Sequence, residues 1–155
     1  MPRLYIVEFE AVSVSAAQDF FEIAPADDKP CEFRGLYLSQ SSDTGDAAEE
    51  ILRLRIIRGH TSSGSGGTAA TPVPVNPNDA AVGFAAEVNN TTIASAGTAV
   101  NLWSYQFNIR TGLELWWPIG AEPGVSQANT TMVVRLLEPN VTFVALVICA
   151  CSQHV

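Results

Sequence analysis

Charged side chains are scarce in this sequence, and their scarcity narrows the range of partners. Only 15% of the 155 residues are charged, well below the quarter that is usual in globular proteins. Seven arginines and the single Lys29 stand against 16 acidic residues, which gives a net charge of −8. Because nucleic acids and anionic membranes are bound through positive charge, this balance argues against both as partners. An uncharged surface is instead typical of a subunit that packs against other proteins.

Residues that could carry out catalysis or bind a metal are also few. The sequence has two histidines, His60 and His154, and neither lies in a metal-binding or catalytic-triad motif. The run 64–67 resembles a phosphate loop but lacks its lysine and the helix that follows. The acidic residues of 27–28, 43–46 and 49–50 lack the ligand spacing of a calcium loop and indicate solvated turns. We therefore expect no enzyme activity, no metal site and no cofactor.

Cysteines and long hydrophobic runs are equally limited. Cys31, Cys149 and Cys151 do not make a disulfide framework, and the last two are too far apart along one strand to bridge easily. The longest apolar run, 141–151, is too short to cross a bilayer. The N-terminus passes directly into a strand pattern without the features of a signal peptide. These features predict a soluble protein with free thiols, made in a reducing compartment.

What the sequence does contain is alternation typical of β-strands, and no helical period lasts for three turns. A short helical turn is expected only at 47–50. The pattern predicts an all-β fold, an antiparallel β-sandwich resembling a jelly roll, in one domain that spans 1–155. The expected strands cover 4–14, 18–23, 31–38, 51–58, 81–88, 98–110, 113–117, 130–137 and 141–152.

A Gly/Ser/Pro-rich segment, 59–79, interrupts the strand pattern. Its first half favours a flexible chain and its second half an extended polyproline geometry. A loop of this length is commonly a functional arm or a disordered linker. Because it carries little charge, we expect an arm lying on another surface, with a solvated linker as the alternative.

The last two strands carry more apolar surface than one sheet face requires. They are expected to form a hairpin around the turn at 138–140. Val144, Leu146 and Ile148 lie on one side of the final strand, and an equally apolar set lies on the other. One side fills the core, so the other needs a cover. That cover is either a neighbouring subunit or the 59–79 loop of the same chain.

Two further clusters have plain structural interpretations. Arg53, Arg55 and Arg58 alternate with apolar residues and predict a solvated or salt-bridged sheet face. Trp116 and Trp117 are adjacent on a strand, so they point to opposite faces. One is therefore expected in the core, and the other half-buried or in an interface. Exposed tryptophans would also suit a carbohydrate-binding surface.

Several segments together resemble small structural proteins from the head regions of tailed phages and prophages, and more loosely the decoration (cement) proteins of phage capsids. These segments are 22–30, 54–60, the Ser/Gly arm and 89–92. The likeness covers most of the chain through structural motifs. It implies a jelly-roll or sandwich trimer that bridges capsomers on the capsid surface, with the major capsid protein as partner. It also implies synthesis in the cytoplasm of a bacterial host.

This role predicts where contacts lie. Trimer contacts are expected at Val144, Leu146 and Ile148. Capsid contacts are expected on the first strand and the arm, at Leu4, Tyr5, Pro72, Pro74 and Pro77. A receptor- or carbohydrate-binding module of a phage tail or fibre is the main alternative. A major coat protein is a further one, and an enzyme ranks last.

Overall fold

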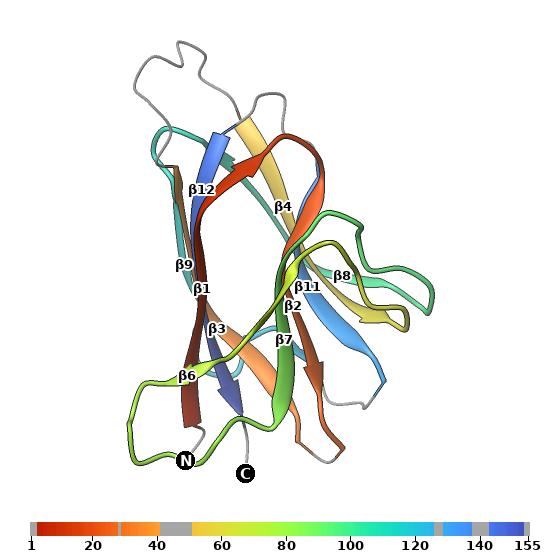
Figure 1. Cartoon of the computed structure of the whole chain (residues 1–155), viewed down its shortest axis with the longest axis vertical. Helices are drawn as coiled ribbons and strands as arrows, with labels where there is room; N and C mark the ends of the chain where they lie inside the picture. Colours follow the sequence, from red (N-terminus) through yellow and green to blue (C-terminus); the bar gives the residue numbers. More distant parts are fainter. Residues whose placement is uncertain (1–2, 28, 41–50, 126–128, 138–142, 154–155) are drawn as a thin grey trace.

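The protein folds into strands connected by turns and loops, as Figure 1 shows. The computed structural model describes residues 3–27, 29–40, 51–125 and 129–137, and the backbone of 143–153. These described parts contain no helix, and so they contain no helix that could cross a membrane. The fold class is all-β, with every strand pairing antiparallel, as the sequence predicts.

The described residues form twelve strands. Most start and end within three residues of the ranges expected from alternation, because apolar residues recur at every second position. They are β1 Arg3–Val14, β2 Gln18–Pro25, β3 Cys31–Gln40, β4 Ile51–His60, β5 Thr68–Ala70, β6 Val73–Pro74, β7 Phe84–Asn90, β8 Val100–Asn108, β9 Leu113–Trp116, β10 Gly124–Val125, β11 Thr131–Leu136 and β12 Phe143–Gln153.

The strands divide between two sheets. Sheet A has the order β10-β3-β12-β1-β6, and β9 also pairs with β3. Sheet B has the order β5-β7-β2-β11-β4-β8. The register of β1 against β12 shifts between Phe9 and Val12, where Ala11 adopts a positive φ of 58°. This bulge bends the strand.

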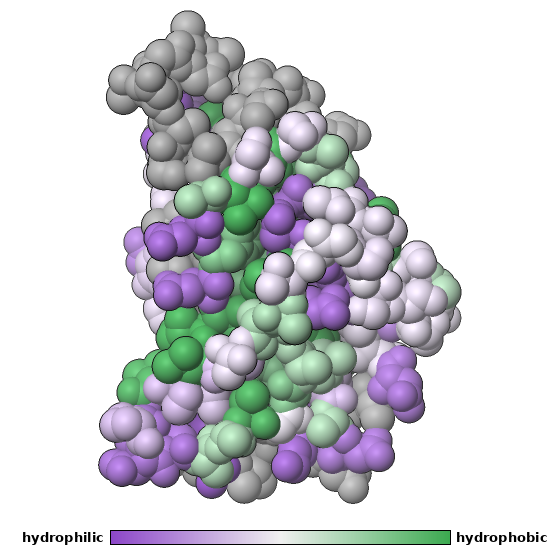
Figure 2. Space-filling view, viewed as in Figure 1, coloured by the Kyte–Doolittle hydropathy of each residue, from purple (hydrophilic) through white to green (hydrophobic). Residues whose placement is uncertain are grey.

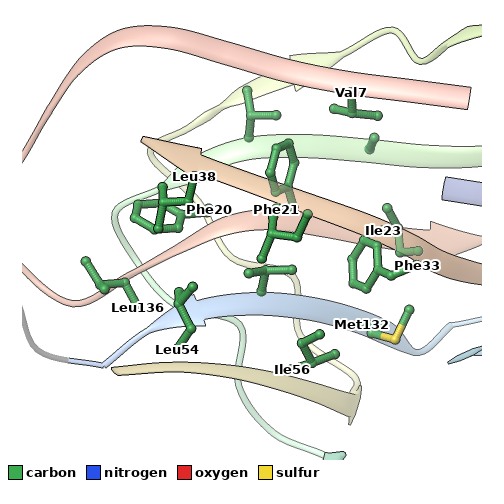
Figure 3. Packing of buried hydrophobic residues seen from close by; sticks show 14 of the residues in the cluster. Val7, Phe20, Phe21, Ile23, Phe33, Leu38, Leu54, Ile56, Met132 and Leu136 are labelled. Carbon is green, nitrogen blue, oxygen red and sulfur yellow. The ribbon is translucent and has the colours of Figure 1, made fainter. Parts of the chain in front are cut away.

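The core lies between the two sheets, which pack face to face as a sandwich. Figure 3 shows side chains from both sheets pointing toward one another, among them Phe33 and Leu38 of sheet A and Phe21 and Ile56 of sheet B. Phe9 of β1 packs against Phe20 and Phe21, with ring centroids 5.8 and 5.7 Å apart. Burial of these large apolar side chains is the main favourable contribution to the stability of the fold.

The predicted C-terminal hairpin is wrong. Strand β11 pairs with β2 and β4 in sheet B, whereas β12 pairs with β1 and β3 in sheet A. The two strands are neighbours in sequence but belong to opposite sheets. The turn at 138–140 lies outside the described residues, as does the helical turn expected at 47–50.

The apolar character of β11 on both faces has an explanation within the chain. Met132, Val134 and Leu136 face the main core, whereas Val133 is buried on the opposite face beside Ile57 and Ala94. Ala94 belongs to the connection between β7 and β8. The cover for this strand is thus a segment of the same chain, and β11 does not require a neighbouring subunit.

The segment 59–79 also differs from the predicted arm. It contributes β5, which pairs with β7, and β6, which pairs with β1. Between β4 and β5, Ser62 and Ser65 form isolated bridges to Ser95 and Thr92. These parts of the segment are thus paired with strands and loops of their own molecule.

Candidate functional site

The predicted trimer contacts lie on β12, a central strand of sheet A. In register, Val144 is opposite Ser13, Leu146 is opposite Ser39, and Ile148 is opposite Glu8 and Tyr37. Ser13, Ser39 and Glu8 are exposed, and Tyr37 is half-buried. Directly opposite residues share a face of a sheet. The side chains of β12 are outside the described residues, so the trimer contact remains a prediction.

The predicted capsid contacts are divided between the core and the surface. Tyr5 is fully buried, its hydroxyl donates to the carbonyl of Ala80 at 2.9 Å, and its ring meets Phe84 edge-on. Pro72 is also buried, whereas Leu4 and Pro74 are half-buried and Pro77 is exposed. Tyr5 and Pro72 therefore contribute to the interior of this chain. Leu4, Pro74 and Pro77 retain surface that a partner could contact.

An apolar row crosses the outer face of sheet A. The register aligns five residues, one from each of five adjacent strands, and we call them the apolar row: Trp116, Gly35, Ala150, Ile6 and Val73. Trp116 is 51% exposed and Val73 is 62% exposed. A third exposed apolar residue, Val75, continues the row beside Leu4, to whose carbonyl its N–H donates at 2.9 Å. Figure 2 shows hydrophobic surface around β6 and the adjoining part of β1.

Trp116 is held in a defined position at one end of this row. Its indole Nε1 donates to the hydroxyl of Tyr37 at 2.6 Å, and the two rings meet edge-on with centroids 5.7 Å apart. The indole also lies over Gly35, where a Cβ would approach within 2.9 Å of the ring. Glycine at this position thus allows the indole to lie flat on the sheet. Trp116 presents a large surface with little conformational freedom left to lose.

The prediction that the adjacent tryptophans point to opposite faces, one of them into the core, is confirmed. Trp117 is 6% exposed and belongs to the main core, whereas Trp116 points outward. Trp117 Nε1 donates to the hydroxyl of Tyr105 at 3.1 Å, which satisfies the buried indole. On the outer face, a hollow lined by Tyr37, Gly112 and Glu114 lies beside the pair formed by Trp116 and Tyr37.

Arg53 and Arg55 of β4 alternate with core residues and lie on the outer face of the other sheet. Arg58 instead lies opposite Met132, which faces the core, and reaches across to β10 of sheet A. Arg53 and Arg58 are exposed and Arg55 is half-buried. Arg58 Nη1 donates to the carbonyl of Gly124 at 3.0 Å. Arg55 lies opposite Arg135, whose charge is neutralised by Asp19.

Two loops on the outer face of sheet B are copies of one pattern, which the sequence analysis missed. Residues 61–69 and 91–99 both read Thr, Ser/Thr, any residue, Gly/Ala, Ser, Gly/Ala, Gly, Thr, Ala. We call residues 61–67 and 91–97 the twin loops. They lie side by side in Figure 1. Ser62 exchanges two backbone hydrogen bonds of 3.0 Å with Ser95, and Ser65 exchanges two of 2.9 Å with Thr92. A comparison of the sequence with itself at a fixed offset would have found the repeat.

The backbone conformation of the twin loops repeats as well. Gly59 and Asn89 have positive φ angles of 94° and 59°, and Gly66 and Ala96 have angles of 80° and 55°. His60 and Asn90 are both buried polar residues just before their loops. Each loop also anchors to β2 through one backbone N–H. Gly64 donates to Glu22 Oε2 at 2.9 Å, and Ala94 donates to Asp19 Oδ2 at 2.7 Å.

Groups suited to catalysis are not brought together in the described part of the chain. His60 is 5% exposed, and neither ring nitrogen has a partner there. It lies opposite Thr131, whose buried hydroxyl also has none. Cys31 is buried, and its Sγ donates to the carbonyl of Lys29 at 3.8 Å. Three or more His, Cys, Asp or Glu side chains do not cluster around a metal position among these residues. Asp43, Asp46, Glu49, Glu50 and His154 lie outside them.

Comparison with known proteins places the chain in no established group. No protein-family model matches it, no curated protein matches it in sequence, and no solved structure matches its fold. We therefore infer the function from the geometry of this chain.

Proposed function

We propose that this protein is a non-catalytic structural subunit that decorates and stabilises a bacteriophage capsid. In this role it bridges capsomers as a symmetric oligomer, most simply a trimer, and its partner is the major capsid protein. The single observation that carries the proposal is the apolar row on the outer face of sheet A, with Trp116 rigidly presented at one end. A soluble monomer has little use for such a row, whereas a protein interface is built around one.

Exposed acidic residues around the apolar row are consistent with the polar rim of a protein interface. Glu8, Glu10 and Glu114 are exposed near the row on the same sheet. Stable interfaces commonly have an apolar centre and a polar rim that excludes water from it. Aromatic anchors such as Trp116 are the residue type that most often dominates binding free energy.

The order of the strands supports a finer assignment of the fold, a jelly roll. Eight of the strands divide equally between the sheets, with β1, β12, β3 and β9 adjacent in sheet A and β2, β11, β4 and β8 adjacent in sheet B. Numbered along the chain, these orders are 1-8-3-6 and 2-7-4-5, the arrangement of a jelly roll. Strands β5 to β7 are then an insertion between the fourth and fifth strands. Jelly rolls are common in viral shells, although they also occur in lectins and cupins.

The trimer is proposed to form through β12 at Val144, Leu146 and Ile148, with the capsid bound through the β1–β6 edge. On that edge, Leu4, Pro74 and Pro77 offer surface, together with the exposed Val73 and Val75. A trimer repeats each contact three times, so modest apolar contacts sum to firm attachment.

Co-sedimentation with intact capsids tests the proposal. The purified chain is mixed with capsids of candidate tailed phages that lack decoration protein, and binding is measured at increasing salt. Saturable binding at a fixed ratio to the major capsid protein, retained at high salt, is expected for an apolar interface. A chain that remains a monomer and pellets with none of these capsids contradicts the assigned role.

A carbohydrate-binding module of a phage tail or fibre is the second candidate, favoured by the outward pair of Trp116 and Tyr37 beside the hollow with Glu114. A flat aromatic ring with nearby polar groups suits the apolar face of a sugar. A glycan array distinguishes the two. Specific glycan binding that is lost in Trp116→Ala, without capsid binding, favours this second role.

A further inference from the structure

Two carboxylates face each other across neighbouring strands beneath the first of the twin loops. Glu22 of β2 and Glu87 of β7 are directly opposite in register. Glu22 lies between Phe21 and Ile23, which both face the core, so its side chain is on the outer face of sheet B. It is nevertheless only 3% exposed, and Glu87 is half-buried. Like charges directly opposite on a sheet repel, and burial strengthens the repulsion.

The hydrogen bonds of the pair come from neutral donors. Glu22 Oε2 accepts from the backbone N–H of Gly64 at 2.9 Å and from Asn90 Nδ2 at 3.0 Å. The same Asn90 nitrogen donates to Glu87 Oε2 at 2.9 Å, and the hydroxyl of Ser63 donates to that oxygen at 3.4 Å. Neither carboxylate forms an ion pair within the described residues. Glu22 Oε1 is fully buried and has no partner there.

The other twin loop shows what the Glu22 side lacks. Asp19 is completely buried and accepts the N–H of Ala94, as Glu22 accepts that of Gly64. Asp19, however, is neutralised by Arg135, which donates to both of its oxygens. The two anchor points are therefore equivalent in the backbone but differ in charge. One contains a fixed cation and the other contains a second carboxylate.

We propose that the Glu22–Glu87 pair binds a divalent cation that takes the place of the arginine. Hard cations such as Ca²⁺ and Mg²⁺ prefer carboxylate, hydroxyl and water oxygens. Glu22 Oε1 and the carboxylate of Glu87 supply the charge, and the hydroxyl of Ser63 is a third candidate ligand. Ser63 is exposed, which gives the ion a route from solvent. Because the site has two carboxylates only, water completes the coordination and the affinity is weak, with a Kd of about 0.1–1 mM.

The bound ion would tie residues 61–67 to sheet B. Thermal unfolding of the intact chain measures this, in 10 mM CaCl₂ or MgCl₂ against KCl of equal ionic strength. A rise in Tm of about 3–10 °C is expected, because a ligand that binds only the folded state stabilises it by mass action. An unchanged Tm in both divalent salts overturns the proposal.

Glu87→Gln is the informative variant. It removes one charge from the pair but can keep the hydrogen bonds of the side chain, so its Tm without divalent ions should equal or exceed that of the unchanged protein. Its response to CaCl₂ should be lost. Glu8→Gln, an exposed position on the outer face of sheet A, is the matched control and should keep the full response. A response that persists in Glu87→Gln overturns the site.

Calorimetric titration of CaCl₂ and MgCl₂ into the unchanged protein gives a second readout that does not depend on any variant folding. Saturable binding near one ion per chain is expected for at least one of the two salts. Absence of binding up to 10 mM of both overturns the proposal. Neither measurement involves a capsid or a glycan, so their results are independent of the proposed function.

Discussion

Asp19 and Arg135 form a buried, two-pronged ion pair that joins β2 to β11. Arg135 Nε donates to Asp19 Oδ1 at 2.6 Å, and Nη2 donates to Oδ2 at 3.0 Å. The same Nη2 also donates to the carbonyl of Ala94 at 2.8 Å. One guanidinium thus links two strands of sheet B to the second twin loop. Fork-like pairing of this kind is among the strongest polar contacts in proteins.

Replacing Arg135 with alanine should therefore be strongly destabilising. The substitution leaves the carboxylate of Asp19 buried without a counter-charge, which costs about 3–5 kcal/mol. Urea denaturation measures the loss in the free energy of unfolding. Arg58→Ala is the matched control, because Arg58 is exposed and makes one hydrogen bond to a backbone carbonyl. A loss below about 1 kcal/mol for Arg135→Ala would show that the pair is not essential.

Gly64→Ala should destabilise the protein although alanine occupies the equivalent position of the other twin loop. A Cβ at Gly64 would approach the carbonyl oxygen of Thr92 within 2.7 Å and Asn90 Nδ2 within 2.8 Å. Overpacking of this kind costs roughly 1–3 kcal/mol. Ser65→Ala, at an exposed neighbouring position, should change stability by less than about 0.5 kcal/mol. If the two variants unfold at the same urea concentration, the loop is not closely packed.

The strands of this fold could be predicted because alternation of apolar residues is a local signal. The ranges of β1, β3, β4 and β11 follow it closely, and so does the opposite orientation of Trp116 and Trp117. The pairing of these strands was harder to predict, because it depends on contacts between distant parts of the chain. Consecutive strands usually pair, which made a hairpin of β11 and β12 the simplest expectation. In the structure, β11 instead lies between β2 and β4, and β12 lies between β1 and β3.

Glycine was misinterpreted for a physical reason. Gly64 and Gly67 allow the first twin loop to approach Asn90 closely, yet a glycine needed for close approach looks the same in sequence as one in a flexible linker. Candidate site residues were missed for a related reason. The apolar row joins Ile6, Val73 and Trp116, and the carboxylate pair joins Glu22 and Glu87. Only the register of the sheets brings them together.

Trp116→Ala should weaken association with a partner while leaving the fold nearly intact. Trp116 is half-exposed, so its loss removes little from the core, and we expect a change in the free energy of unfolding below about 1.5 kcal/mol. An aromatic anchor that is buried in an interface contributes about 2 kcal/mol or more to binding, so its loss corresponds to at least a roughly 30-fold weaker Kd. Capsid binding and urea denaturation measure the two effects.

Trp103→Ala is the control for this variant, because Trp103 is 40% exposed but lies on the edge strand of the other sheet. It should bind capsids as the unchanged protein does. Equal losses of capsid binding in both variants would mean that the apolar row is not the contact surface.

Leu146→Arg tests the proposed trimer. Leu146 is on β12, the central strand of sheet A, and in register it lies opposite the exposed Ser39 of β3. Three arginines brought together at a shared axis would repel one another and leave charges without partners, which costs several kcal/mol in a dry interface. Light scattering should therefore report a monomer. Ser104→Arg, at an exposed position on sheet B, should preserve the trimer. If Leu146→Arg has the same molar mass in solution as the unchanged protein, β12 is not the trimer interface.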